Sequence, residues 1–172
     1  MKKIAIILTL ALCLSLFAGC GSQSAAPTIT APAGTTEELM NKLYENVTVE
    51  LPLMTMPVDL TDEYAVSTFL GTADVSAVKE ASASESMIGA QAYSVELVRV
   101  NDAAQAEAVA QAMFDSIDTR KWVCVEATEK QAVVCGDLVM FVMLDPQYGV
   151  TTNQIVEAFT TVCGGTVGTI LK

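Results

Sequence analysis

The stretch from Leu138 to Leu144 restricts the fold of this chain more than any other. It reads Leu-Val-Met-Phe-Val-Met-Leu, so every side chain is apolar. A strand with one solvated face alternates apolar and polar residues, whereas a strand covered on both faces is apolar throughout. Pro146 and Gly149 end the run. The sequence therefore predicts that this strand lies centrally in a β-sheet.

The flanking patterns predict an α+β domain. Residues 92–100 alternate in polarity as a half-buried strand does, and apolar residues from Ala106 to Ile117 recur at helical spacing behind Asp102. Residues 122–127 and 132–144 are predicted to pair as a hairpin. We expect a two-layer fold, with an antiparallel sheet of about four strands packed against helices and reminiscent of ferredoxin-like sheets.

Helices are also predicted at both ends of this region. Thr35 and Glu38 have the spacing of a capping box, which predicts that a helix begins at Thr35. Thr151 or Thr152 is expected to cap a last helix, which Gly164 and Gly165 end. Residues 166–171 would add a short edge strand.

The N-terminus has the pattern of a lipoprotein signal peptide. Two lysines precede an apolar run over residues 4–17, which is shorter than the ~20 residues that span a bilayer. Ala18-Gly19-Cys20 follows, and this pattern predicts cleavage between Gly19 and Cys20 and attachment of a diacylglycerol, with palmitate-type chains, to the Cys20 thiol. The third position before the cysteine is usually Leu but is Phe17 here. The alternative is an ordinary secretory signal with Cys20 incidental.

These patterns divide the chain into three parts. Residues 1–19 are the predicted signal peptide. Residues 20–35 are the lipidated cysteine with a flexible Ser-, Ala- and Pro-rich tether. Residues 36–172 form a single domain. The expected location is the outer side of the cell membrane, held there by the lipid anchor.

Composition narrows the function classes. Cleavage removes two of the nine basic residues and none of the twenty acidic ones, which changes the net charge from −11 to −13. Such a chain repels nucleic acid, which we therefore exclude as a partner. The absence of histidine excludes Ser-His-Asp and Cys-His catalysis, and no phosphate-binding glycine loop is present. We predict no catalytic residue and no cofactor.

Cys124, Cys135 and Cys163 remain after the signal peptide and Cys20. In the predicted hairpin Cys124 lies opposite Cys135, which would allow a cross-strand disulfide. The alternatives are buried thiols or, with less support, a three-cysteine metal site; we predict no metal.

Cationic residues supply the remaining candidate contacts with a ligand or partner. Arg120, Lys121 and Trp122 follow the predicted helix and could grip an anion or stack on a sugar. The alternative is compensation of the helix dipole beside a buried indole. Arg99 ends a strand and is expected at its rim, paired with an acid such as Asp102.

Several of these motifs resemble those of a known family. They are Ser-Met-Ile-Gly at 86–89, Tyr-Ser-Val-Glu-Leu-Val-Arg-Val at 93–100, Arg-Lys-Trp-Val-Cys-Val at 120–125 and Gly-Asp-Leu-Val at 136–139. They resemble uncharacterised Gram-positive bacterial lipoproteins that carry domain of unknown function 4358, over residues 36–159. A proline often precedes Arg-Lys-Trp in that family, and Thr119 stands there here. The resemblance supports a lipoprotein and implies no activity.

The sequence thus favours a non-catalytic binding or interaction module of the cell envelope. Its partner would be an envelope protein, a wall component or a small solute. The alternative is an enzyme that acts on envelope polymers through two carboxylates.

Overall fold

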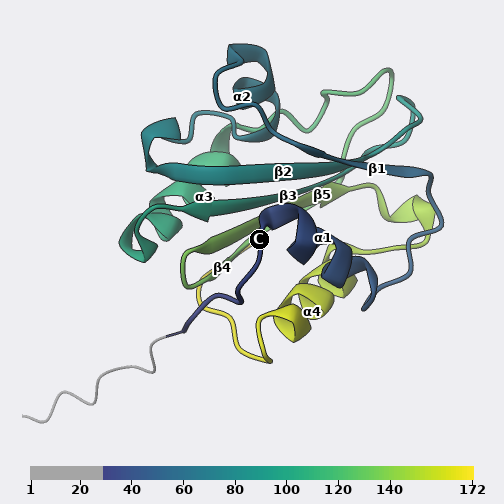
Figure 1. Cartoon of the computed structure of the whole chain (residues 1–172). Coiled ribbons are helices and arrows are strands. Elements are labelled where there is room, and N and C mark those ends of the chain that lie inside the picture. The colour runs from purple at the N-terminus through teal and green to yellow at the C-terminus, as the bar shows by residue number, and fades with distance from the viewer. Residues whose placement is uncertain (1–28) are drawn as a thin grey trace, which may run out of the picture.

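The computed structural model describes residues 29–172, which fold into one α+β domain with a six-stranded antiparallel sheet and four α-helices (Figure 1). The predicted signal peptide and Cys20 lie outside the described residues. The helices and strands are α1 (Thr36–Tyr44), β1 (Leu53–Pro57), α2 (Glu63–Phe69), β2 (Val78–Ser86), β3 (Tyr93–Val100), α3 (Ala106–Ser116), β4 (Glu129–Cys135), β5 (Leu138–Leu144), α4 (Thr152–Val162) and β6 (Ile170–Leu171).

The strand order is β1-β2-β3-β5-β4-β6. All seven residues of β5 are buried, and the strand lies between β3 and β4, which confirms the central strand predicted from its composition. The sheet has six strands rather than about four because β1 and β6 add one short strand at each edge. The edge strand expected within residues 166–171 forms as β6, whereas β1 was not predicted and ends in Pro57.

Helices cover both faces of the sheet, so the domain has three layers where two were expected. One apolar cluster joins α1 and α4 to the face that carries Tyr93, Val95 and Leu97. A second cluster joins α3 to the face that carries Val98 and Val100. In Figure 1, α1 and α4 lie below the sheet, and α2 and α3 lie on its other side. The purely apolar β5 requires this double cover.

The predicted hairpin of residues 122–127 with residues 132–144 is wrong, because the turn lies farther along the chain. Residues 118–128, expected to contribute its first strand, form an irregular connection that we call the 118–128 loop. Residues 132–144, expected as one strand, instead divide between the end of β4 and β5. These two strands pair across a tight turn at Gly136 and Asp137, with Cys135 opposite Leu138. Gly136 has a φ of +59°, a conformation that glycine adopts without strain. Short-range alternation at Val123 and Val125 therefore predicted a strand where none forms.

Capping residues begin the helices where local sequence predicted them. Thr35 and Glu38 make both hydrogen bonds of a capping box at the start of α1, and Thr151 and Gln154 do the same for α4. Asp102 accepts a hydrogen bond from the Ala104 amide and begins the short turn that leads into α3. The predictions for α1 and α4 are confirmed because each depends on residues within one helical turn. Helix α3 instead begins after Gln105, which makes no capping hydrogen bond through its side chain.

Candidate functional site

The four predicted cationic and aromatic contact residues separate into two groups at opposite ends of β3. Lys121 contacts Ser94 and Glu96 near the start of this strand, and Arg99 lies near its end. The five residue steps from Ser94 to Arg99 span about 17 Å, and the alternation of side chains along a strand places Ser94 and Arg99 on opposite faces of the sheet. They form two sites rather than one.

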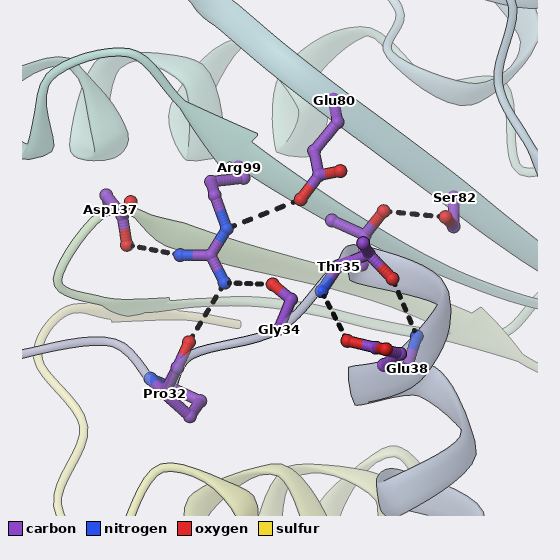
Figure 2. Close-up of polar contacts among 9 residues, drawn as sticks. Pro32, Gly34, Thr35, Glu38, Glu80, Ser82, Arg99 and Asp137 are labelled. Carbon is purple, nitrogen blue, oxygen red and sulfur yellow. Dashed lines mark hydrogen bonds and ion pairs between the residues drawn. The ribbon is translucent and has the colours of Figure 1, made fainter.

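Arg99 binds the N-terminal segment of the described chain (Figure 2). Its Nη2 donates hydrogen bonds to the carbonyl oxygens of Pro32 and Gly34, at 2.9 and 3.1 Å. Its Nη1 donates to Asp137 Oδ1 at 2.7 Å, and its Nε lies 3.5 Å from Glu80 Oε1. We call this arrangement the Arg99 clamp. The acids that pair with Arg99 are thus Glu80 and Asp137, whereas the expected partner Asp102 caps a turn instead.

The segment held by the clamp belongs to the domain. A Cβ added at Gly136 would lie 2.6 Å from the Ala31 nitrogen and 2.9 Å from the Ile29 oxygen, so backbone passes directly over the β4–β5 turn. Ile29 and Ala31 also pack against the α1 and α4 side of the core. Residues of the 29–35 segment, which the sequence assigned to the tether, thus pack against the domain.

Lys121 forms a buried ion cluster that joins the 118–128 loop to the sheet. Its Nζ lies 2.9 Å from Glu85 Oε1 and 3.2 Å from Glu96 Oε1, and it donates a hydrogen bond to Ser94 Oγ at 3.0 Å. Only 10% of the side chain is exposed, and the Phe69 ring centroid lies 4.6 Å from Nζ. An ammonium enclosed in this way holds the loop in place and is not available to an external anion.

Glu96 is the unusual member of this cluster. The residue is fully buried, and its Oε2 has no hydrogen-bond partner. Burial raises the pKa of the Glu96 carboxyl, while the Lys121 charge and the Ser94 hydroxyl oppose the rise. Glu96 was not among the residues predicted from the sequence, because the alternation of Ser94 and Glu96 with apolar residues indicated a solvated face.

The cluster brings together a serine, a lysine and two carboxylates, which are groups that catalyse reactions in other proteins. Glu85 and Glu96 converge, but Lys121 lies between them and both are paired with it. A serine activated by lysine requires an amine that is free to take its proton, whereas Lys121 is held in ion pairs with two carboxylates. Ser94 and Glu96 are also closed to solvent. The geometry therefore favours a structural role for these groups.

Arg120 and Trp122 face a hollow instead. The hollow measures about 370 Å³ and is lined by Arg120, Trp122, Cys124, Val125 and Glu126. Arg120 is 73% exposed, and its Nε lies 2.9 Å from Glu126 Oε2, so the two charges at the rim compensate one another.

Cys124 does not pair with Cys135. Cys124 is exposed in the 118–128 loop, whereas Cys135 is buried at the end of β4, and both are free thiols, as is Cys163. The predicted disulfide is wrong because it required residues 122–127 to be a strand. Cys124 also has a φ of +62°, in the left-handed region that costs a non-glycine residue about 1–2 kcal/mol.

Exposed apolar side chains lie beside the hollow. Of the large hydrophobic residues exposed within residues 29–172, four belong to neighbouring segments, and we call them the apolar tip: Met54, Met87, Ile88 and Val123. The Val123 amide donates to the Gly89 oxygen, and the Met87 amide donates to the Pro52 oxygen. These bonds hold the 118–128 loop, the β2–β3 connection and the start of β1 together.

The part of the chain that the structure describes holds neither a candidate membrane span nor a candidate cluster of metal ligands. None of its helices combines the length and apolarity needed to cross a bilayer. None of its groups of histidine, cysteine, aspartate or glutamate has three members placed to hold a metal ion. Comparison of the chain with protein-family models, with curated proteins and with solved structures finds no match.

Proposed function

We propose that this chain is a membrane-anchored extracytoplasmic lipoprotein whose domain binds another envelope protein through the apolar tip and the adjoining hollow. The observation that carries the proposal is the separation of two ends of the domain. The Arg99 clamp holds the N-terminal segment at one end of β2 and β3, and the apolar tip lies at the other. Figure 1 allows the two ends to be followed along the sheet.

The anchor would orient the domain. Nine peptide units join Cys20 to Ile29, and an extended chain of that length reaches about 30 Å at most. The clamp therefore sets the side of the domain that lies nearest the lipid, and the apolar tip points away from it. The resemblance of the motifs to those of Gram-positive lipoproteins supports the same location.

The chemistry of the tip favours a protein partner over an anionic polymer. Methionine, isoleucine and valine side chains bury well against another apolar surface, and methionine adapts its shape to the partner. The nearby charges are paired within the domain, Arg120 with Glu126 and Lys121 with Glu85 and Glu96. No uncompensated cation there would attract a charged wall polymer.

The alternative function, a carboxylate enzyme that acts on envelope polymers, has less support. Its most favourable pair of acids, Glu85 and Glu96, is bound to Lys121, and Glu96 is closed to solvent. A substrate would have to displace the lysine and open the sheet to reach both carboxylates.

Site-specific photocrosslinking in intact cells tests the proposal. A photoreactive amino acid at Val123 should crosslink to a defined envelope protein, and Met87→Asp in the same chain should abolish that product. Tyr64 is the matched control, because it is exposed on α2 outside the apolar tip. A photoreactive residue at Tyr64 should not give the product. Equal crosslinking from both positions, or a product insensitive to Met87→Asp, would contradict the proposed surface.

The anchor is tested separately by cell fractionation. Cys20→Ala should move the protein from the membrane fraction to the soluble extracytoplasmic or culture fraction, because the thiol that carries the lipid is gone. Unchanged retention in the membrane fraction would refute lipid anchoring at Cys20, whatever the result of crosslinking.

A further inference from the structure

Helix α4 runs alongside strand β4, and hydrogen bonds hold their beginnings together. Gln131 Nε2 donates to Thr152 Oγ1 at 2.9 Å and to Asn153 Oδ1 at 2.8 Å. The Thr152 amide donates to Glu129 Oε2 at 3.1 Å. The first turn of the helix is therefore placed over the first half of the strand.

The lengths of the two elements then bring their far ends together. Four residues of strand carry the chain about 13 Å from Gln131 to Cys135. Eleven residues of helix carry it about 16 Å from Thr152 to Cys163, which ends α4. Gln131 and Cys135 are an even number of residues apart, so both side chains point toward the helix. Cys163 thus ends over Cys135.

The packing of both thiols agrees with this placement. Cys135 and Cys163 belong to the same apolar cluster beneath α4, together with Val133 and Phe159. Each thiol is also the largest influence on the pKa of the other: the Cys163 thiol lowers the pKa of Cys135, and the Cys135 thiol raises the pKa of Cys163.

We propose that Cys135 and Cys163 form a disulfide that joins the end of β4 to the end of α4. The proposal rests on the proposed extracytoplasmic location, where disulfides form and persist. Both thiols lie in one cluster, so only their separation has to close to the S–S bond length of about 2.05 Å. Cys124 remains a free thiol, since it is exposed in the 118–128 loop and both other cysteines belong to the cluster beneath α4.

The oxidation needs an electron acceptor, which we identify by class as the disulfide of an extracytoplasmic thiol–disulfide oxidoreductase. Cys163 is the more accessible thiol, so a mixed disulfide forms there first and one oxidoreductase sulfur leaves as a thiol. The Cys135 thiolate then attacks the Cys163 sulfur, which forms the Cys135–Cys163 bond and releases the second oxidoreductase sulfur as a thiol. Two protons and two electrons pass in total from the protein thiols to the oxidoreductase.

Peptide mapping of the full chain tests the proposal. Protein from the native envelope is quenched in acid, denatured, alkylated with N-ethylmaleimide and digested without reduction. Trypsin alone leaves Cys135 and Cys163 in one peptide, because no lysine or arginine lies between Lys130 and Lys172. Adding a protease that cleaves before aspartate separates the three cysteines into residues 122–130, 131–136 and 145–172.

The expected result is a linked pair of peptides 131–136 and 145–172, with Cys124 alkylated. Cys124→Ala should leave the link intact, and Cys163→Ala should leave Cys135 alkylated. A link that involves Cys124, or alkylation of all three thiols, would overturn the proposal. In the second case the detergent-solubilised full chain is incubated with oxidised glutathione. If the link forms only after this treatment, the pairing is right and the proposed location is wrong. If no link forms even then, the pairing itself is wrong.

Discussion

Replacement of Arg99 by alanine should destabilise the domain and release its N-terminal segment. The side chain is 9% exposed and makes hydrogen bonds or ion pairs with Pro32, Gly34, Asp137 and Glu80. Removing one partner of a fully buried pair costs about 3–5 kcal/mol. Asp137 and Glu80 are 37% and 32% exposed, so water can reach them once the guanidinium is gone. We therefore expect a loss of about 2–3 kcal/mol in the free energy of unfolding.

Urea denaturation measures this loss, and Arg120→Ala is the matched control. Arg120 also makes a short ion pair, but the pair is exposed, so its removal should cost at most about 1 kcal/mol. Hydrogen exchange read by mass spectrometry adds a local measurement. Arg99→Ala should speed exchange over residues 29–35, and Arg120→Ala should not. Arg99→Lys should fall between the unaltered chain and Arg99→Ala, because an ammonium keeps the charge but cannot reach both carbonyl oxygens and Asp137 together.

Two results would refute the reasoning. If Arg99→Ala and Arg120→Ala lower the free energy of unfolding by equal amounts, the burial of Arg99 does not make its contacts more stabilising than those of Arg120. If exchange over residues 29–35 is unchanged in Arg99→Ala, the clamp does not hold the segment, and the proposed orientation of the domain loses its support.

Two further substitutions test other parts of the structure. Gly136→Ala should destabilise the domain by more than Gly149→Ala, in denaturation measurements, and should also speed exchange at Ala31. Both glycines have positive φ, which costs alanine about 1–2 kcal/mol, but of the two only Gly136 has backbone where the new Cβ would lie. Equal losses in the free energy of unfolding would contradict the close approach of the N-terminal segment to Gly136. Glu96→Gln should flatten the dependence of stability on pH. Because burial raises the pKa of Glu96 above its ordinary value, the folded state binds this proton more tightly than the unfolded state does, so stability falls as pH rises from about 4.5 through the raised pKa. Denaturation of the Gln variant over the same range should lack that fall, and an identical profile in both proteins would show that Glu96 does not titrate as described.

Local patterns account for the parts of the fold that were predicted correctly. The capping boxes of α1 and α4 depend on residues three apart, and the central position of β5 follows from seven consecutive side chains. The same local reasoning failed at residues 122–127, where alternation over a few positions is compatible with both a strand and a loop. The two-residue turn at Gly136 made a different hairpin available, and the apolar match between β4 and β5 favours that hairpin.

The candidate sites were predicted only as residue types, without their partners. Lys121 was singled out, but its carboxylate partner Glu96 lies 25 residues away in sequence. Arg99 was singled out as well, and the Pro32 carbonyl that it binds lies 67 residues away. Cys135 was assigned the wrong partner, because the position of Cys163 depends on how α4 lies against β4.

The sequence by itself thus determined the α+β class, the central strand, the beginnings of α1 and α4 and the expectation of a lipid anchor at Cys20. These features depend on hydrogen bonds and side-chain periodicity within a few residues, and such short-range interactions can be inferred from composition and spacing. Tertiary structure alone decided which helices cover each face, that Arg99 holds the N-terminal segment and that Lys121 is buried between two acids. Those contacts join residues that are distant in the chain, and they form only when several elements share the burial of one apolar sheet.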